Sequence, residues 1–110
     1  MIAGGCVGFV VSPGSRHTPL VMAAAQAGVR TEVVLDERSA GFLALGWAKA
    51  AQAPVALMCT SGTAGAHYLP AVIEAWESGV PLVLVTTDRP PEHLSVGAPQ
   101  TTRQDGFYTH

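Results

Sequence analysis

The sequence has little charge: 13% of its 110 residues are Asp, Glu, Lys or Arg, and the formal net charge is −2. Six basic residues stand against eight acidic ones with no cluster of either sign, which excludes the basic surface that binds nucleic acid. Disorder is excluded as well, because 48% of the residues are hydrophobic. No apolar run reaches the roughly 18 residues of a membrane-spanning helix. The composition therefore predicts one globular domain with no nucleic-acid partner and no membrane insertion.

Cysteine is scarce too, and its spacing does not fit the usual metal sites. Cys6 and Cys59 form neither a CxxC pair nor a metal-ligand spacing, which fits two buried thiols in a reducing cytoplasm. Paired spacing is likewise missing from three histidines, which we expect on the surface or in loops: His17, His93 and His110. We interpret Cys59 and His67 as a buried strand cysteine and a helical histidine, not as a nucleophile and its base. We predict no metal ligands in this chain.

Three common motifs are absent. Residues 4–8 precede an apolar run, whereas a dinucleotide-binding fingerprint follows a strand. No GxxxxGK segment occurs, which excludes the Walker-type nucleotide hydrolases, and no GxSxG segment occurs, so acyl transfer has no support. The first residues look like the end of a helix that stops at Gly4 or Gly5, and we expect the chain to be part of a longer enzyme.

Four short apolar runs alternate with alanine-rich segments. The runs are rich in β-branched residues, as strands buried on both faces of a parallel sheet are, and they span 7–11, 31–35, 55–59 and 81–86. The segments between them have helical character and span 18–27, 37–51 and 63–78. This alternation predicts right-handed βαβ crossovers and an α/β domain of three layers, α/β/α, around a parallel sheet.

The segment 37–51 carries small residues at helical spacing. Ala40, Ala44 and Ala48 form one stripe. Gly41 and Gly46 each cost a helix roughly 1 kcal/mol relative to alanine. We interpret both glycines as places where the helix lies close to the sheet or to a neighbouring helix.

Nearly all polar chemistry follows the predicted strands. The loops are 12–17, 36–38, 60–63 and 87–92, and the carboxyl ends of parallel strands are where ligands bind in such sheets. The turn 60–63 allows two interpretations: free N–H groups that hold an anion or a polar ring, or a simple helix cap by Thr60 or Ser61. Glu37 also allows two: a partly desolvated functional acid, or an acid that complements the helix dipole.

The pattern Glu-x2-Ala-x3-Ala-x-Gly-x-Ala, which begins at Glu37, resembles the pyrimidine-binding domain of thiamine-diphosphate enzymes. In that family a Glu follows the second strand, and a turn such as 60–62 follows the third. Further segments resemble one branch of it, the 2-succinyl-5-enolpyruvyl-6-hydroxy-3-cyclohexene-1-carboxylate synthases of menaquinone and phylloquinone biosynthesis. These segments are 12–20, 36–41, 88–92 and Gly97-Ala98-x-Gln100-x3-Gln104. The resemblance covers almost the whole chain in the right order.

The resemblance implies an enzyme that decarboxylates 2-oxoglutarate on thiamine diphosphate and adds the succinyl unit to isochorismate. Glu37 would hydrogen-bond N1′ of the aminopyrimidine and favour the 4′-imino tautomer that removes the thiazolium C2 proton. Burial of a carboxyl group favours its protonated form, which aids such an exchange near neutral pH. Thr60, Ser61 and Gly62 would complete the cofactor site.

The resemblance also implies residues for the two substrates, which are both dianions. Arg16 and Arg89 would bind carboxylates through bidentate hydrogen bonds, a geometry that lysine does not offer. Ser15 and Gln100 would supply neutral hydrogen bonds. The alternative for both arginines is a solvated loop charge or a structural ion pair, in the case of Arg89 with Asp88.

Three positions depart from the pattern of this branch. Ser12 stands where Cys is usual, His67 where Asn is usual, and Pro99 where Asn commonly precedes the Gln. Pro99 removes a side-chain amide beside the expected substrate, so the binding there is expected to differ in detail.

Members of this branch have three domains, so the resemblance implies that residues 1–110 are a partial pyrimidine-binding domain. We expect a truncated flavodoxin-like fold with strand order 2-1-3-4, without its first helix and a final strand or two. The central domain, and the domain that holds the diphosphate and Mg²⁺, would lie outside this chain, the latter in the partner subunit of a homodimer or homotetramer. We expect the chain alone to be inactive and the complete protein to be cytoplasmic.

Two alternatives remain open. The first is the pyrimidine-binding domain of another thiamine-diphosphate enzyme, such as a relative of acetolactate synthase or oxalyl-CoA decarboxylase. The second is a non-catalytic binding module on the same fold.

Overall fold

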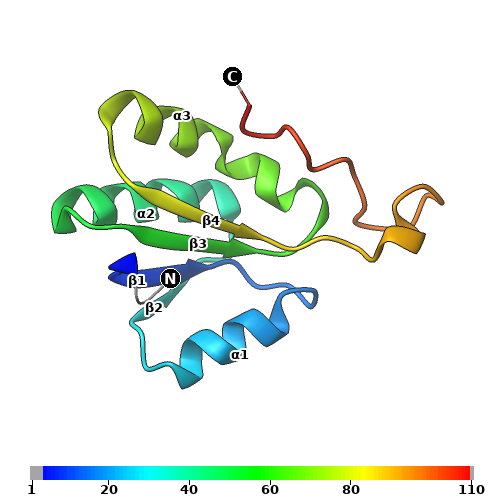
Figure 1. The fold of residues 1–110 in the computed structure, drawn as a ribbon, viewed down its shortest axis with the longest axis horizontal. Helices are drawn as coiled ribbons and strands as arrows, with labels where there is room; N and C mark the ends of the chain where they lie inside the picture. The colour runs from blue at the N-terminus through cyan, green and yellow to red at the C-terminus, as the bar shows by residue number, and fades with distance from the viewer. Residues whose placement is uncertain (1–3, 110) are drawn as a thin grey trace.

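The computed structural model describes residues 4–109 and contains a four-stranded parallel sheet (Figure 1). The strands are β1 (Gly8–Val11), β2 (Thr31–Val33), β3 (Val55–Cys59) and β4 (Leu82–Thr86). Their order is β2-β1-β3-β4, and all three pairings are parallel. The predicted α/β class and strand order are therefore confirmed. The helix end expected before Gly4 involves residues 1–3, which lie outside the described residues.

Helices cover both faces of the sheet (Figure 1). Helix α1 (Thr18–Gln26) lies on one face, and α2 (Glu37–Ala51) and α3 (Leu69–Ser78) lie on the other. The α2 bounds are those predicted from the sequence. In the described part of the chain, no helix is long and apolar enough to span a membrane.

The single helix predicted over 63–78 is wrong in its first half. The chain forms a 3₁₀ helix, η2 (Gly62–Tyr68), before α3 begins at Leu69. Pro70 lies in the first turn of α3, where a backbone N–H has no partner within the helix, so its absence costs nothing. An α-helix that ran on from residues 63–68 would need a donor at Pro70, and proline has none. The tighter helix keeps residues 62–68 against the end of the sheet.

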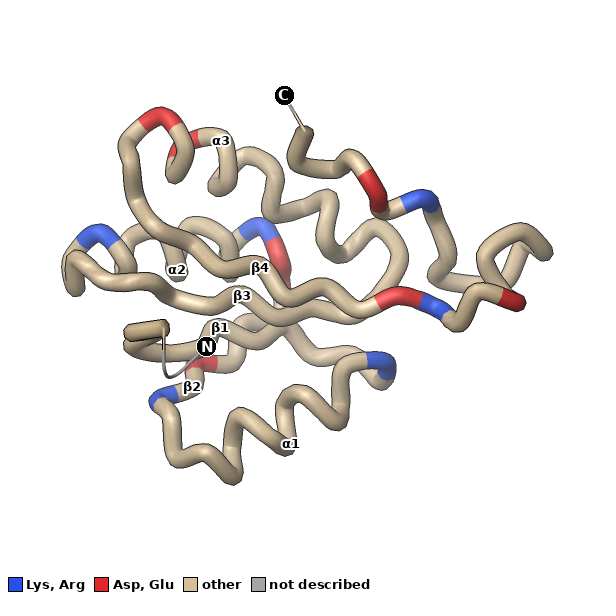
Figure 2. The backbone as a smooth tube through the Cα atoms, in the orientation of Figure 1, with Lys and Arg blue, Asp and Glu red and all other residues tan. Residues whose placement is uncertain are grey.

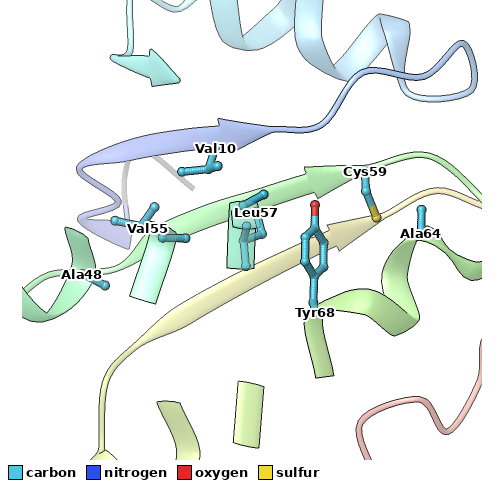
Figure 3. Packing of buried hydrophobic residues seen from close by; sticks show 9 residues of the cluster. Val10, Ala48, Val55, Leu57, Cys59, Ala64 and Tyr68 are labelled. Carbon is cyan, nitrogen blue, oxygen red and sulfur yellow. The ribbon is translucent and has the colours of Figure 1, made fainter. Parts of the chain in front are cut away.

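The core is divided between the two faces because alternate strand residues point to opposite sides. On the face of α2, the buried cluster contains residues from β1, β3, α2 and η2 (Figure 3). Its members are Val10, Ala40, Ala44, Ala48, Val55, Leu57, Cys59, Ala64 and Tyr68. On the face of α1, Ala24 packs with Phe9, Val11, Ala56, Met58 and Cys6. Both cysteines are buried and free, as expected.

The small-residue stripe of α2 is buried as predicted, but its two glycines differ. Ala40, Ala44 and Ala48 are each fully buried. A Cβ at Gly41 would lie 3.0 Å from the Cβ of Ala71 on α3, so this glycine allows close helix packing. The same interpretation is wrong for Gly46, which is exposed and has no atom within 4 Å of a Cβ position.

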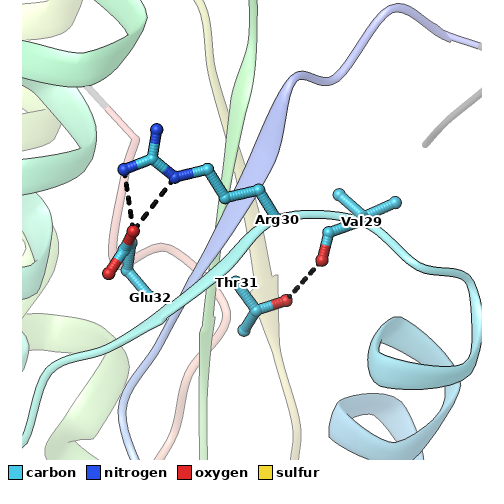
Figure 4. Close-up of polar contacts among 4 residues, drawn as sticks. All are labelled: Val29, Arg30, Thr31 and Glu32. Carbon is cyan, nitrogen blue, oxygen red and sulfur yellow. Dashed lines mark hydrogen bonds and ion pairs between the residues drawn. The ribbon is translucent and has the colours of Figure 1, made fainter.

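The residues around β2 are tied to α2 by an arginine. Arg30 donates from Nε and Nη2 to the same carboxylate oxygen of Glu32, at 3.0 and 2.9 Å (Figure 4). Its guanidinium carbon lies 4.7 Å from the ring centroid of Trp47. That indole covers β1 so closely that a Cβ on Gly8 would lie 2.0 Å from a ring carbon. Gly8 is thus the residue that lets Trp47 pack on the sheet.

Candidate functional site

A cleft of about 450 Å³ opens at the edge of the sheet where the parallel strands end. It is formed by the turn after β3, the start of η2, the first turn of α2 and the segment 100–102. The lining residues are Pro13, Glu37, Thr60, Ser61, Gly62, Thr63, Ala64, His67, Gln100, Thr101 and Thr102. In Figure 2, charged segments after β1 and β4 lie beyond the same strand ends. The polar loops therefore gather at one edge, as the topology requires.

Glu37 lines this cleft from the first residue of α2. It is half-buried, and it also lines a smaller adjoining cavity of about 340 Å³. Neither carboxylate oxygen has a hydrogen bond or an ion pair with any described residue. The preceding Asp36 is engaged instead: its carboxylate accepts from the backbone N–H of Arg38 at 2.9 Å and pairs with the Arg38 guanidinium at 2.6 Å. The capping and pairing duties thus fall on Asp36, which leaves the Glu37 carboxylate available to a ligand.

The contacts with Arg38 also change the pKa of Asp36. Side-chain and backbone hydrogen bonds from Arg38 hold the pKa of Asp36 well below its usual range. Asp36 therefore stays ionised at any pH near neutrality. The only ionisable side chains that line the larger cleft, among the described residues, are Glu37 and His67.

The turn after β3 fits neither sequence interpretation fully. Thr60 and Ser61 are buried, but neither side chain caps η2. Ser61 Oγ donates to the carbonyl oxygen of Gln100 at 3.1 Å. The Gly62 N–H, which a ligand would otherwise use, donates to Oε1 of Gln104 at 2.8 Å. The capping interpretation is therefore wrong, and the Ser61 hydroxyl and the Gly62 N–H are both already engaged by the segment that contains Gln100 and Gln104.

Gly62 is required for two reasons. Its φ of +83° lies in the left-handed region that favours glycine. A Cβ there would also lie 3.1 Å from the carbonyl carbon of Gln100. Gln100 itself has a φ of 55°, a conformation that costs a non-glycine residue on the order of 1 kcal/mol or more. The two backbones thus meet in a strained contact at the wall of the cleft.

The remaining predicted residues do not line the cleft. Ser15 and Arg16 are exposed on the loop after β1. Arg89 is half-buried, and its Nη2 donates to the carbonyl oxygen of Pro99. The alternative of an ion pair with Asp88 is wrong, because the Asp88 carboxylate accepts from the backbone N–H of Arg89 at 2.7 Å. Arg89 thereby connects the loop after β4 to the residue that precedes Gln100.

Besides Arg89 Nε, several side-chain polar atoms are buried without a hydrogen-bond partner among the described residues. They are Ser12 Oγ, Thr60 Oγ1, Tyr68 OH and both ring nitrogens of His17. His17 lies in a loop as expected, directly before α1, but its side chain is fully buried and not at the surface. Burial lowers the pKa of His17, so the ring is neutral near pH 7.

Cys59 is unsuited to nucleophilic chemistry. It is fully buried, and burial raises the pKa of its thiol to about 11. His67 lies on the exposed side of η2, so the two do not form a nucleophile and base. Among residues 4–109, no group of three or more His, Cys, Asp or Glu side chains is arranged to hold a metal ion.

Sequence reasoning missed Gln104 as a contact residue. Gln104 belongs to a segment that carries the resemblance, but no contact was predicted for it, because its partner Gly62 lies 42 residues away. His67, Thr63, Thr101 and Thr102 also line the cleft without having been predicted to do so.

Comparison with known proteins shows the family to which the chain belongs. Residues 5–107 match the family described as thiamine pyrophosphate enzyme, N-terminal TPP binding domain. The chain is 54% identical over 108 residues to the 2-succinyl-5-enolpyruvyl-6-hydroxy-3-cyclohexene-1-carboxylate synthase of Dechloromonas aromatica, covering 97% of this chain and 20% of that protein. It is 62% identical over 100 residues to the synthase of the same name from Geobacillus kaustophilus, covering 90% and 17%. The chain therefore spans about a fifth of the length of the curated relatives it matches.

Proposed function

This chain belongs to the family of thiamine pyrophosphate (thiamine diphosphate) enzymes as an N-terminal TPP-binding domain, and we propose that it forms the pyrimidine-binding part of a synthase that decarboxylates 2-oxoglutarate and adds the succinyl unit to isochorismate. The observation that carries the proposal is the position of Glu37. Its free, half-buried carboxylate lines one cleft with Thr60, Ser61 and Gly62 at the carboxyl edge of a parallel sheet. The identity to synthases of this name supports the choice of substrates.

The cleft fits an aminopyrimidine ring. Its volume of about 450 Å³ lies within the usual range for small-molecule sites. Its lining brings the unpaired Glu37 carboxylate together with the hydroxyl side chains of Thr60, Thr63 and Thr101. When bound, thiamine diphosphate supplies the electron sink for decarboxylation and carbon–carbon bond formation. The diphosphate and Mg²⁺ are assigned to a domain outside residues 4–109.

Glu37 holds and transfers a proton. Its carboxyl group would hydrogen-bond a ring nitrogen of the bound pyrimidine and exchange a proton with it, as a positioned acid–base group does. Because Asp36 is already paired with Arg38, Glu37 does not share its proton with the neighbouring acid. The packing of α2 through its buried alanine stripe fixes the first turn and therefore the carboxyl group.

Arg16 and Arg89 bind substrate carboxylates, and Ser15 and Gln100 add neutral hydrogen bonds. A guanidinium carries five N–H donors, and Arg89 uses one of them on Pro99. No other hydrogen bond from its guanidinium to a described residue is present, so the remaining N–H groups of Nη1 and Nη2 can bind a carboxylate. Arg16 is exposed and free to turn toward a ligand at the same sheet edge.

We expect Arg16→Lys and Arg89→Lys each to raise KM for a substrate or lower kcat by about 10- to 100-fold in the complete synthase. The reason is that a lost hydrogen bond to a charged group is worth roughly 1.5–3 kcal/mol. Steady-state kinetics with each substrate varied in turn measures the effect, and Arg30→Lys, far from the cleft, is the control. Effects below twofold for both variants would remove the arginines from the substrate site.

The complete protein is proposed to be a cytoplasmic homodimer or homotetramer. Two free, buried cysteines fit a reducing compartment. Leu35 and Trp76 are 82% and 77% exposed, and apolar surface of this kind favours association with further protein. By the same assignment, residues 1–110 alone do not turn over substrate.

The proposed reaction is tested by assaying the complete protein with isochorismate and either 2-oxoglutarate or pyruvate. We expect succinyl transfer from 2-oxoglutarate and no turnover of pyruvate. Turnover of pyruvate without turnover of 2-oxoglutarate would assign the domain to an acetolactate-synthase-like enzyme. No turnover with either donor would favour a non-catalytic module.

A further inference from the structure

One side chain connects two loops at the carboxyl edge of the sheet. Gln104 accepts from the Gly62 N–H through Oε1 at 2.8 Å and donates from Nε2 to the Thr87 carbonyl oxygen at 3.0 Å. Gly62 follows β3 and Thr87 follows β4, so the amide spans the ends of two adjacent strands. Both bonds have ordinary lengths, and the side chain is partly buried between the two loops.

The amide satisfies both partners at once. A backbone N–H only donates, and a carbonyl oxygen only accepts, so the bridging group must offer one acceptor and one donor. A glutamate of the same shape would keep the bond from Gly62 but place a second acceptor against the Thr87 carbonyl oxygen. A leucine would lose both bonds and leave the Gly62 N–H unpaired.

The contact holds together two parts of the cleft wall that are far apart in sequence. Residues 60–64 and 100–102 line the cleft from opposite ends of a segment of about 40 residues. They meet where Ser61 Oγ donates to the Gln100 carbonyl oxygen and where Gly62 touches the left-handed backbone of Gln100. A strained conformation persists only where its surroundings fix it. The Gln104 side chain holds Gly62 in place. Because Gln104 follows Gln100 by four residues, it also restrains the segment on which Gln100 lies.

We propose that Gln104 is a positioning residue, whose amide holds Gly62 and Gln100 in the arrangement that binds ligand in the cleft. The identity of that ligand rests on the proposed function. No hydrogen bond connects Gln104 to Glu37, which lies on α2 across the cleft. Loss of the clamp therefore displaces the binding wall and leaves the proton-transferring group in place.

The test uses Gln104→Leu and Gln104→Glu, with Gln26→Leu on the exposed end of α1 as the matched control. The first readout is amide hydrogen exchange at Gly62, measured on the complete protein. We expect Gln104→Leu to speed this exchange roughly tenfold, the equivalent of one ordinary hydrogen bond. Gln104→Glu keeps the acceptor and should leave Gly62 protected. Unchanged exchange at Gly62 in Gln104→Leu would overturn the clamp.

The second readout is steady-state kinetics of the complete synthase. Both Gln104 variants should raise KM for isochorismate roughly tenfold while kcat stays within about twofold of the parent, because each breaks the bridge to Thr87 that holds the cleft wall and neither touches Glu37. A variant that merely unfolds more would lower kcat at unchanged KM, and that result would contradict the positioning role. Faster exchange with unchanged KM and kcat would contradict it too. If the parent protein lacks succinyl transfer, the proposed function fails, whereas the exchange experiment still decides whether Gln104 holds the turn.

Discussion

Replacing Glu37 by Gln is expected to lower kcat of the complete synthase by about 10²- to 10⁴-fold, the usual contribution of a positioned acid–base group. Glutamine keeps the shape of the side chain and can still hydrogen-bond, but it cannot exchange a proton with a ring nitrogen. Glu37 forms no ion pair or side-chain hydrogen bond with the described residues, so folding should be almost unaffected. Steady-state kinetics at saturating cofactor, together with thermal unfolding, separates the two effects.

The matched control is Glu77→Gln on α3, where the side chain is exposed and remote from the cleft. It should leave kcat within about twofold of the parent, as surface substitutions away from a site usually do. Glu37→Gln with activity like that of the control would mean that the carboxyl group has no part in the reaction. The non-catalytic alternative would then be preferred.

Gly8→Ala is expected to produce the largest loss of stability among the glycine substitutions. The new Cβ would lie 2.0 Å from a carbon of the Trp47 ring, so the indole must move from its place on β1. Overpacking of this kind costs typically 1–3 kcal/mol. Movement of the ring also disturbs its contact with Arg30. A fall in Tm of about 4–8 °C for each kcal/mol is expected for a domain of this size.

Gly46→Ala is the control because it makes the same chemical change in open space on α2. No atom lies within 4 Å of its Cβ position, and alanine is favoured over glycine in a helix by about 0.5–1 kcal/mol. Thermal unfolding should therefore show a higher Tm for Gly46→Ala and a lower one for Gly8→Ala. A shift in the same direction for both would mean that Trp47 does not pack on Gly8 as described.

The fold could be predicted from the sequence because its signals are local and regular. Short apolar runs such as 7–11 and 55–59 determine the parallel strands, and the alanine stripe that begins at Ala40 determines how α2 packs. The prediction of a single helix over 63–78 was wrong because Gly62, Gly65 and Pro70 favour a 3₁₀ start over a continuous α-helix. Gly46 shows that small size alone does not indicate close packing.

The site was predictable only in part. Glu37 and the turn 60–62 follow strands directly, so topology alone brings them to one edge. The positions of Arg16 and Arg89 depend on loop conformations that no periodicity encodes. His17 lies in the loop before α1 as expected, but its full burial depends on tertiary packing that the sequence around it does not encode. Gln104 depends on contacts between residues about 40 positions apart, which no local pattern reveals.

The central claim is that the Glu37 carboxyl group faces the pyrimidine ring of the coenzyme in this cleft. A crystal structure of the complete protein with thiamine diphosphate bound tests it most directly. The account predicts a Glu37 carboxylate oxygen within hydrogen-bond distance, roughly 2.6–3.0 Å, of a pyrimidine ring nitrogen, beside Thr60 and Gly62. A coenzyme whose ring lies elsewhere, with Glu37 directed to solvent, would contradict the account.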